Sequence, residues 1–359
     1  MSKKIIFSAG GTGGHIFPAI NLMRHFFNKG YKVLLVTDTR GNNFIKNYSE
    51  FQSYVLRVET STNKNFLKKL FSFLVIFYSI IRSVIILKKE KPDLILGFGG
   101  YASFPISFAS RFFNLPLIIY ENNMVLGRAN RYLSLLSKKI LVAKKIVMNF
   151  PEKYKSKTYE VGPILGKNIL NYTISKKNNN QESFSILVLG GSQGAKIFGT
   201  IVPPVIKMLK DRGYNIRILQ QCIMSQKSSI IDFYKKNSIK NYVFEFDKNI
   251  LELILSSNLA ITRCGASTTA ELTHTMTPFI AVPLSNSIDN HQYLNAKYYE
   301  NNGCCWLLEQ KNFNTKNLFS LIMKTIKDKN KLENIRKNMK KNYKKNAYND
   351  IENEIKEFI

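Results

Sequence analysis

An apolar strand that runs directly into a glycine-rich loop and then into a helix constrains this chain more than any other feature. Residues 5–7 are apolar, as in a buried strand, and residues 10–15 read GGTGGH. From Pro18 onward, apolar side chains recur at helical spacing. Such a loop directs backbone N–H groups and the positive end of a helix dipole at its ligand, so we expect a polar or anionic ligand above it.

The glycine spacing argues against a dinucleotide site at this first loop. Counted from Gly11 and Gly13, the third glycine of the G-x-G-x-x-G fingerprint would fall at Ile16. A purely structural turn between strand and helix remains the alternative. Four glycines around a threonine, followed by a histidine, exceed what a turn requires and favour a ligand site.

A second strand, glycine loop and helix begin near residue 184, which indicates two similar halves. Residues 184–189 read FSILVL and residues 190–195 read GGSQGA. The pattern predicts an α/β fold of two Rossmann-like domains that face each other across a deep cleft. Further strands are expected over residues 31–37, 92–97, 116–123, 139–143, 158–163, 215–220, 242–246, 259–262 and 279–282, with a loop over residues 38–43.

A polar tract rich in asparagine and lysine, residues 168–183, indicates a surface segment near the domain boundary. We expect an N-terminal domain over residues 1–163 and a C-terminal domain over residues 164–340. Residues 341–359 are expected to form a C-terminal helix that packs back on the N-terminal domain.

The composition is that of a globular protein with a very basic surface. Of 359 residues, 45% are hydrophobic and 21% charged, which excludes a disordered chain, and the formal net charge is +29. This charge suits a polyanionic partner such as nucleic acid or an anionic lipid surface, but a general bias toward lysine and asparagine would produce it as well. No RNA-binding signature accompanies the charge, so we expect no nucleic-acid partner.

Cysteine usage and the first residues favour the cytoplasm. The cysteines form no C-x-x-C pair, as expected for a reducing compartment; they are Cys222, Cys264, Cys304 and Cys305. Residues 1–4 run directly into the first strand, with no signal-peptide pattern.

The most apolar stretch, residues 66–87, is flanked by lysines on both sides. Three interpretations are open: a membrane-spanning helix, an ordinary core helix, and a helix exposed as a membrane-surface patch. Arg82 and Ser83 interrupt the stretch, and a buried strand follows at once, which argues against a spanning helix. The basic flanks favour the membrane surface.

Polar segments follow several predicted strands, where open α/β sheets bind their ligands. They include a glycine loop at residues 97–101, residues 121–123, residues 263–272 and residues 285–292. Glu271 would lie in a helix that starts after Gly265, where it could accept hydrogen bonds from the cis-diol of a ribose. It could equally be a dipole partner in a helix capped by Ser267. Residues 289–292 suit sugar hydroxyls, or could cap the next helix.

Six of these motifs, in order, resemble the MurG glycosyltransferases. They are AGGTGGHIFPA at residues 9–19, GFGGYASFP at 97–105, ENN at 121–123, LGGSQGA at 189–195, TRCGASTTAEL at 262–272 and DNHQYLNA at 289–296. Members of this family move N-acetylglucosamine from UDP-N-acetylglucosamine to undecaprenyl-diphosphate-linked N-acetylmuramoyl pentapeptide, turning lipid I into lipid II of peptidoglycan. The resemblance implies the GT-B fold, with an acceptor-binding, membrane-associating N-terminal domain and a UDP-sugar-binding C-terminal domain.

The resemblance also implies donor-binding residues, matched position by position. Ser192 and Gln193 would meet the diphosphate and sugar, and Glu271 the ribose hydroxyls. Residues that would meet or shape the N-acetylglucosamine site are Arg263, Ala266, Ser267, His291 and Gln292. From the N-terminal half, the residues assigned to UDP-N-acetylglucosamine are Thr12, Gly13, Gly14 and Asn123.

On the acceptor side, the resemblance assigns Gly11, His15, Tyr101 and Glu121, with Thr12 and Asn123 also lining the cleft there. His15 is the first choice for the general base and Glu121 the second, while a histidine that only binds the acceptor diphosphate is the alternative. The first glycine loop is then expected to meet the lipid-linked diphosphate rather than a nucleotide.

Three positions depart from the family pattern. Tyr120 stands where the family usually has a histidine before the glutamate. The linker motif lacks its asparagine, and Lys167 is only a candidate for the displaced basic residue. Asp247 falls where an apolar residue usually meets the uracil.

The implied reaction is an inverting single displacement, in which the acceptor C4 hydroxyl attacks the anomeric carbon of the donor. No D-x-D motif is present, so we expect no protein-bound metal and no tightly bound cofactor, with Mg²⁺ acting loosely on the diphosphate as a stimulant. Expected partners are UDP-N-acetylglucosamine, lipid I, an anionic membrane surface, and other cell-wall and division proteins, at the cytoplasmic face of the cell membrane. The competing hypotheses are a GT-B glycosyltransferase with another lipid acceptor and a non-catalytic nucleotide-binding protein at a membrane surface.

Overall fold

The chain divides into two compact units, unit 1 (Met1–Gly166 with Lys344–Ile359) and unit 2 (Lys167–Tyr343). The computed structural model describes residues 2–45, 50–58, 66–145, 147–148, 150–172, 183–191, 195–343 and 347–359. The two crossings between units follow residues 166 and 343, where we expected them after residues 163 and 340. Much of the polar tract at residues 168–183 lies outside the described residues.

Unit 1 is built on a seven-stranded parallel sheet in the order β3-β2-β1-β4-β5-β6-β7. Its central strands are almost entirely buried and mostly apolar, as expected of a parallel sheet covered on both faces. Strand β3 was not predicted, because it has only four residues, none of them is fully buried, and its first two are polar. The strands are β1 (Lys4–Ser8), β2 (Lys32–Thr37), β3 (Gln52–Val55), β4 (Leu94–Gly97), β5 (Leu117–Glu121), β6 (Lys139–Val142) and β7 (Thr158–Glu160).

Helices follow most strands of unit 1, as the alternating pattern predicted. They are α1 (Gly13–Asn28), α2 (Thr39–Ile45), α3 (Phe66–Glu90), α4 (Ser103–Ala109) and α5 (Arg128–Leu133). The loop expected over residues 38–43 is wrong, because α2 occupies most of it. Asp38 Oδ1 accepts a hydrogen bond from Gly41 N at 2.7 Å, so this carboxylate satisfies an N–H group in the first turn of α2.

The last helix, α14 (Ala347–Ile355), belongs to unit 1, although it follows all of unit 2 in the sequence. The Glu352 carboxylate contacts His25 Nε2 of α1 and accepts a hydrogen bond from Lys29 Nζ at 2.7 Å. Lys139 Nζ on β6 donates to the Glu354 carboxylate at 3.0 Å. Acidic side chains on α14 therefore meet basic side chains of the first domain.

Unit 2 repeats the plan with a six-stranded parallel sheet in the order β10-β9-β8-β11-β12-β13. Strands β8 and β11 coincide with the predicted ranges. Strand β13 has only three residues and was not predicted. The strands are β8 (Phe184–Leu189), β9 (Ile216–Gln221), β10 (Lys240–Phe244), β11 (Leu259–Thr262), β12 (Phe279–Ala281) and β13 (Cys305–Leu307).

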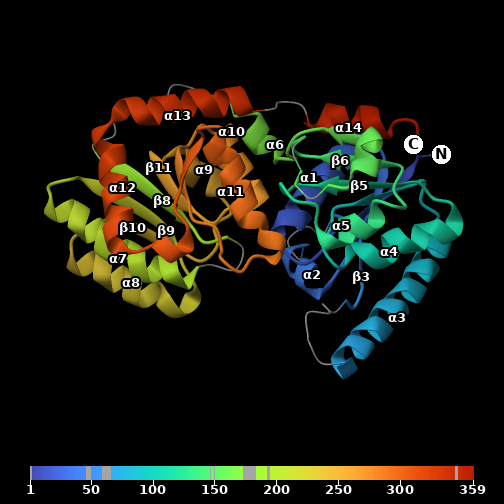
Figure 1. The fold of residues 1–359 in the computed structure, drawn as a ribbon. Helices are drawn as coiled ribbons and strands as arrows, with labels where there is room; N and C mark the ends of the chain where they lie inside the picture. Colours follow the sequence, from blue (N-terminus) through green and yellow to red (C-terminus); the bar gives the residue numbers. More distant parts are fainter. Residues whose placement is uncertain are drawn as a thin grey trace. The chain divides into compact units, whose positions relative to one another are not determined.

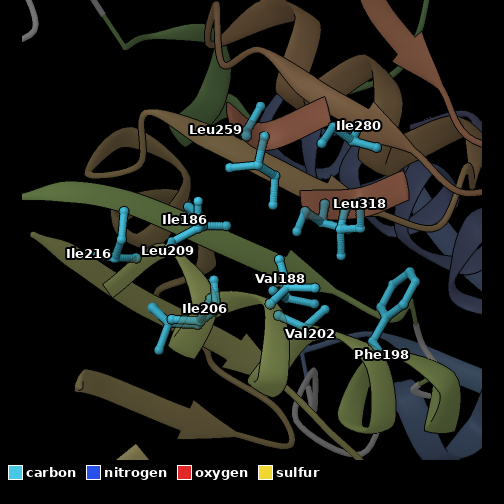
Figure 2. Packing of buried hydrophobic residues seen from close by; sticks show 14 of the residues in the cluster. Ile186, Val188, Phe198, Val202, Ile206, Leu209, Ile216, Leu259, Ile280 and Leu318 are labelled. Atoms are coloured by element: carbon cyan, nitrogen blue, oxygen red, sulfur yellow. The ribbon is translucent and has the colours of Figure 1, made fainter. Parts of the chain in front are cut away.

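The core of unit 2 forms where helix α7 lies on the sheet. Phe198, Val202 and Ile206 point from α7 toward Ile186 and Val188 of β8 (Figure 2). All five side chains are fully buried, and this packing fixes the strand whose end carries the second glycine loop. The helices of unit 2 are α6 (Lys167–Leu170), α7 (Lys196–Asp211), α8 (Met224–Lys236), α9 (Ile250–Leu255), α10 (Ala266–His274), α11 (His291–Asn301), α12 (Thr315–Lys327) and α13 (Lys329–Asn342).

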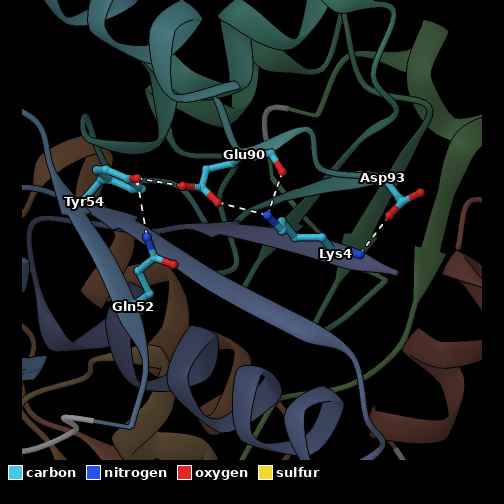
Figure 3. Close-up of polar contacts among 5 residues, drawn as sticks. All are labelled: Lys4, Gln52, Tyr54, Glu90 and Asp93. Atoms are coloured by element: carbon cyan, nitrogen blue, oxygen red, sulfur yellow. Dashed lines mark hydrogen bonds and ion pairs between the residues drawn. The ribbon is translucent and has the colours of Figure 1, made fainter. Parts of the chain in front are cut away.

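Helix α3 reaches away from the rest of unit 1 at its N-terminal end, while its C-terminal end is tied to the sheet (Figure 1). Glu90 Oε1 accepts from the Tyr54 hydroxyl at 2.7 Å, and Glu90 Oε2 accepts from Lys4 Nζ at 3.0 Å (Figure 3). The Tyr54 hydrogen bond is the main cause that lowers the pKa of Glu90. Asp93, just before β4, accepts from Lys4 N at 2.8 Å.

The rest of α3 buries polar side chains and exposes apolar ones, which is the reverse of an ordinary core helix. Ser72, Ser79 and Ser83 are buried, whereas large apolar side chains are exposed. The interpretation as an ordinary core helix is therefore wrong for this stretch. The segment Leu70–Glu90 is long and apolar enough to cross a membrane, and β4 follows it directly in the sheet. The side chains at least 45% exposed are Leu70, Phe71, Phe73, Leu74, Phe77, Tyr78, Ile81 and Ile85.

Candidate active site

The first glycine loop packs against the loop that follows β4. A Cβ on Gly10 would lie 2.3 Å from the Ala102 Cβ, and a Cβ on Gly100 would lie 2.4 Å from the Gly10 carbonyl oxygen. Gly100 also has a φ of 77°, which other residues rarely adopt. Glycine is therefore required at both positions, and the two loops expected at one ligand site do meet.

Helix α1 begins at this loop and exposes its N-terminus. Thr12 occupies the cap position without a side-chain cap, and Gly13, Gly14 and His15 form the first turn. The N–H groups of Gly13 and Gly14 have no hydrogen-bond partner among the described residues, as required of an anion or hydroxyl site. Gly11 has open space where its Cβ would be.

His15 lies beside the second loop and near α5. A Cβ on Gly99 would be 3.3 Å from His15 Cε1 and 3.2 Å from Asn130 Nδ2, so the imidazole and this amide flank Gly99. His15 is partly exposed, whereas Asn130 is fully buried. Tyr101, half-buried, closes the loop after β4.

Asp38 supports the first loop from the end of the neighbouring strand. Its Oδ1 atom accepts from Gly11 N at 3.2 Å as well as from Gly41 N. Arg40 Nε lies 3.8 Å from its other oxygen and compensates part of the charge. The sequence alone did not single out Asp38, although a polar residue directly after the second strand is the available signal.

Glu121 is 1% exposed, and both of its carboxylate oxygens hold the loop after β5. Oε1 accepts from Asn123 N and Asn123 Nδ2, each at 3.0 Å. Oε2 accepts from Gly127 N at 2.9 Å and from Asn130 Nδ2 at 3.0 Å. These bonds fix the orientation of the Asn123 side chain.

Tyr120, the departure from the family histidine, is buried and binds the segment that leaves the unit. Its hydroxyl lies 3.1 Å from Asn122 Oδ1 and 3.1 Å from the Gly162 carbonyl oxygen. It also accepts a hydrogen bond from Ile164 N at 3.2 Å. In this chain, Tyr120 therefore has a structural role, because its hydroxyl hydrogen-bonds to the segment that leaves the unit.

In unit 2, the second glycine loop and the turn after β11 lie at the ends of adjacent strands. Gly190 N donates to Gln221 Oε1 at 3.0 Å, and Gln221 Nε2 donates to the Glu245 carbonyl at 2.9 Å. A Cβ on Gly191 would be 3.9 Å from the Arg263 Cβ, so the loop passes beside this arginine. Ser192 and Gln193, both expected at the donor, lie outside the described residues.

Arg263 is held inside the protein. Its Nη1 donates to the carbonyls of Val282 at 3.1 Å and Pro283 at 3.2 Å, and its guanidinium lies 5.0 Å from the Phe198 ring centroid. Burial lowers the pKa of Arg263 from its ordinary value. The side chain therefore shapes the end of the sheet, and the role expected for it at the sugar stays a prediction.

Helix α10 begins at Ala266, so Ala266 and Ser267 lie in its first turn, where backbone N–H groups point outward. Glu271 follows on the second turn and is partly exposed. Burial raises the pKa of Glu271 to about 7. No described residue donates a hydrogen bond to its carboxylate, which argues against a purely structural role and suits a ligand that supplies the donors.

Gln292 bridges the two polar segments of unit 2. Its Oε1 accepts from Cys264 N at 3.3 Å and from Leu284 N at 3.0 Å. Asn295 is buried and donates from Nδ2 to the Cys264 carbonyl at 3.0 Å, a support that the sequence did not reveal. Consecutive left-handed residues, Asp289 and Asn290, precede α11.

His291 opens α11, and its Nδ1 donates a hydrogen bond to the Ile288 carbonyl oxygen at 2.7 Å. Asp247 binds within its own loop, accepting from the Tyr242 hydroxyl at 2.8 Å and from Asn249 N at 2.7 Å. Lys167 is exposed at the start of α6.

The comparisons with known proteins agree with this two-unit plan. The glycosyltransferase family 28 N-terminal domain matches residues 5–142, and the glycosyltransferase family 28 C-terminal domain matches residues 185–355. The chain is 36% identical to the UDP-N-acetylglucosamine--N-acetylmuramyl-(pentapeptide) pyrophosphoryl-undecaprenol N-acetylglucosamine transferase of Rickettsia canadensis, over 92% of this chain and 93% of the relative. It is 35% identical to the protein of the same name from Pelagibacter ubique, over 92% and 91%.

A solved structure shows the same fold. The crystal structure of Acinetobacter baumannii MurG superposes with a TM-score of 0.80 at 24% identity, covering 99% of each chain. Two parallel-sheet α/β domains of the GT-B class are therefore confirmed. With both family 28 domains in order and relatives of this identity along nearly the whole chain, the protein belongs to the MurG family of glycosyltransferases.

Proposed function

We propose that the chain transfers N-acetylglucosamine from UDP-N-acetylglucosamine to undecaprenyl-diphosphate-linked N-acetylmuramoyl pentapeptide, the reaction that turns lipid I into lipid II. The observation that carries the proposal is the pair of adjacent strand ends in unit 2, where the Gly190 loop passes Arg263 and Glu271 offers an unpaired carboxylate. This set suits a sugar nucleotide, and the names of the relatives state the same transfer.

For the donor, Glu271 accepts hydrogen bonds from the ribose diol, and the loop at residues 190–193, including Ser192 and Gln193, binds the diphosphate. Backbone N–H groups of Ala266 and Ser267, with His291 and Gln292, bind the N-acetylglucosamine hydroxyls, and Arg263 shapes the site. Thr12, Gly13, Gly14 and Asn123 supply further donor contacts from unit 1.

For the acceptor, Gly11, Tyr101 and His15 bind near the reacting hydroxyl. His15 takes the proton of the C4 hydroxyl as that oxygen bonds to the anomeric carbon, and the electrons of the broken bond leave with UDP. Glu121 was the second choice for the base, but its oxygens already accept four hydrogen bonds, so it acts by positioning Asn123.

The exposed apolar side of α3 suits contact with a membrane surface, where the lipid-linked acceptor resides. Such contact makes the protein peripheral at the cytoplasmic face of the cell membrane, and the net charge of +29 suits an anionic surface there. Other cell-wall and division proteins are further proposed partners. Replacing Phe73, Leu74 and Phe77 by serine should abolish flotation with anionic vesicles, and unchanged flotation would remove this part of the proposal.

Among the described residues, no group of three or more His, Cys, Asp or Glu side chains could hold a metal ion. We propose catalysis without a tightly bound cofactor, with Mg²⁺ stimulating through the UDP diphosphate. A chelator should therefore reduce transfer only partly, and complete loss that other divalent ions fail to restore would contradict the proposal.

The decisive experiment measures radiolabel transfer from UDP-N-acetylglucosamine to a lipid I analogue, with diacylglycerol and no acceptor as controls. Transfer only to the lipid I analogue supports the proposal. Transfer to diacylglycerol alone would indicate the related glycosyltransferase, and tight UDP-N-acetylglucosamine binding without transfer would indicate a non-catalytic protein.

A further inference from the structure

The crossing segment, residues 161–166, leaves unit 1 after β7 and is buried although it has no regular secondary structure. Its apolar side chains Val161, Ile164 and Leu165 are at most 3% exposed. Buried backbone N–H and C=O groups outside helices and sheets need hydrogen-bond partners, which side chains can supply. Here the hydroxyls of two tyrosines that lie far apart in the sequence, Tyr120 and Tyr348, supply such partners.

We propose that Tyr120 and Tyr348 are positioning residues for the transfer. Their hydroxyls hold the crossing segment in a fixed relation to the loop after β5, which carries Glu121 and Asn123. They thereby set the point at which the chain leaves the acceptor-binding unit for the donor-binding unit.

The Tyr120 hydroxyl joins the crossing segment to the loop after β5. It accepts a hydrogen bond from Ile164 N at 3.2 Å. It also lies 3.1 Å from the Gly162 carbonyl oxygen and 3.1 Å from Asn122 Oδ1. A phenolic hydroxyl has one proton to donate, so these two acceptors share it. A shift of the segment at Gly162 therefore alters the hydrogen bond that reaches Asn122, inside the loop that Glu121 holds.

The rest of Tyr120 is fixed among residues of the proposed acceptor side. Its ring centroid lies 5.5 Å from that of Phe98, which precedes Gly99 in the loop after β4. Its carbonyl oxygen accepts from Asn130 Nδ2 at 3.1 Å, and this amide flanks Gly99 together with His15. Because Tyr120 is 4% exposed and close-packed, its hydroxyl keeps the crossing segment in register with these loops.

Tyr348 holds a later residue of the crossing segment from the last helix, α14. Its hydroxyl donates a hydrogen bond to the Leu165 carbonyl. Its ring lies against His25 of α1, with the ring centroids 4.8 Å apart, and α1 is the helix that begins at the first glycine loop. Unit 2 begins at Lys167, just beyond Leu165. The two tyrosines therefore fix the chain on unit 1 almost to the boundary.

This inference rests on the proposed function and deepens it. The proposed acceptor residues belong to unit 1 and most of the proposed donor residues to unit 2, so transfer depends on how the chain passes from one to the other. Reacting groups must be held in a narrow range of geometry, and a small misplacement lowers the rate of the chemical step. Neither tyrosine is proposed to touch a substrate. Loss of either hydroxyl should therefore lower kcat and leave donor affinity unchanged.

The first experiment measures transfer from UDP-N-acetylglucosamine to a lipid I analogue by the full chain in detergent. Tyr120→Phe removes only the hydroxyl and should lower kcat by roughly tenfold. The dissociation constant of UDP-N-acetylglucosamine, measured by calorimetry, should not change. An unchanged kcat, or a loss of donor affinity as large as the loss of kcat, would overturn the inference.

Tyr54→Phe is the matched control in the same unit. The Tyr54 hydroxyl also donates one hydrogen bond, to Glu90 Oε1 at 2.7 Å, and accepts one, from Gln52 Nε2 at 3.4 Å. Both of these partners lie outside the crossing segment. Tyr54→Phe should lose thermal stability but keep its kcat. If it lowers kcat as much as Tyr120→Phe does, the effect comes from general destabilisation and the positioning role fails.

The second experiment combines the two tyrosines, and its single variant Tyr348→Phe tests the same segment even where Tyr120→Phe does not fold. Tyr348→Phe should also lower kcat. The double variant Tyr120→Phe/Tyr348→Phe should lose less than the product of the two single effects, because both hydroxyls hold one segment. Losses that multiply would show that the tyrosines act independently and would overturn the inference.

Hydrogen exchange, read by peptide mass spectrometry, tests the hold on the crossing segment directly. Exchange over residues 161–166 should be faster in Tyr120→Phe and in Tyr348→Phe than in the unmodified protein and in Tyr54→Phe. Unchanged exchange there would contradict the role of the hydroxyls. If the unmodified protein transfers no sugar, the proposed function fails and this inference with it, whereas transfer that both variants retain in full removes the inference alone.

Discussion

The two glycine loops look alike in sequence, but different chemistry supports them. In unit 1, a carboxylate just after the second strand, Asp38, accepts a hydrogen bond from Gly11 N. In unit 2, a carboxamide at the equivalent place, Gln221 at the end of β9, accepts from Gly190 N. Other loops of the two units differ in the same way. In unit 1 the carboxylate of Glu121 accepts hydrogen bonds from the loop after β5, and in unit 2 the carboxamide of Gln292 accepts from Cys264 N and Leu284 N.

Because of this difference, the two loops suit ligands of different charge. Carboxamides hold the loops of unit 2 without adding negative charge, which suits the UDP diphosphate. A carboxylate beside Gly11, only partly compensated by Arg40, opposes a second anion there. We therefore favour the sugar hydroxyls of the acceptor, rather than its diphosphate, as the group that meets the first loop.

The largest effect should come from His15→Ala, which tests whether the first loop carries the reacting end of the acceptor. Loss of a general base should lower the single-turnover rate of transfer by about 10²- to 10⁴-fold, with acceptor affinity nearly unchanged. Rapid-quench measurement with radiolabelled donor gives both values. The base assignment fails if acceptor affinity falls while the single-turnover chemistry stays the same.

Replacing Glu121 by glutamine tests the carboxylate supports of unit 1. A glutamine amide would face groups that donate hydrogen bonds, so we expect a loss of about 2–4 kcal/mol in the free energy of unfolding. Urea unfolding measures the loss. Transfer by the folded variant should show a raised KM with an unchanged pH profile, whereas loss of the acid limb of the profile would restore Glu121 as a base.

Gln221→Glu gives the second loop the support chemistry of the first. A carboxylate near the donor diphosphate should raise the KM for UDP-N-acetylglucosamine by roughly tenfold, with a smaller change in kcat. Gln221→Met is the matched control, because it removes the same hydrogen bonds without adding charge. If both variants have the same KM, charge does not distinguish the loops.

The smallest effect concerns the pH dependence of donor binding. The pKa of Glu271 is about 7 in the folded chain, against 4.5 for a free glutamate, and the ionised form accepts the ribose hydrogen bonds. Donor affinity should therefore fall as the pH drops through about 7, by up to about tenfold between about pH 8 and about pH 6. Donor binding near neutral pH should release a proton.

Calorimetry in buffers of different ionisation enthalpy detects that proton, and Glu271→Gln should abolish it. The raised pKa also means that ionisation of Glu271 destabilises the fold, so the stability it contributes is fully present below about pH 4.5 and lost as pH rises through about 7. Glu271→Gln should therefore unfold at a higher temperature than the unmodified protein above about pH 7. No difference between the two proteins would contradict the burial of this carboxyl.

Local pattern predicted most of this fold, because parallel strands covered on both faces are continuous apolar runs. Strand β8 and strand β11 begin and end where the sequence predicts. The short, partly exposed strand β3 gives no such signal. Helix α2 was not predicted, because Asp38, which accepts a hydrogen bond from its first turn, is a residue type that is also typical of loops. The family motifs marked the two glycine loops and the turn after β11, and the ligand roles of their residues stay predictions.

The residues that support those loops were harder to find. Gln221 and Asn295 lie about 30 residues in sequence from the backbone groups they bind, and only the folded sheet brings them together. Their amide side chains occur anywhere on a protein surface, so composition and spacing do not mark them. The α3 sequence predicted a long apolar helix. Only the structure shows that its serines are buried and that its large apolar side chains are exposed.

The docking of α14 on unit 1 bears on the order in which the chain can fold during synthesis. Tyr348 of α14 donates from its hydroxyl to the Leu165 carbonyl, and Glu352 reaches back to His25. The ribosome makes all of unit 2 before it makes α14. The first domain to leave the ribosome is therefore the last to be completed, and unit 2 can finish folding as an insertion within it.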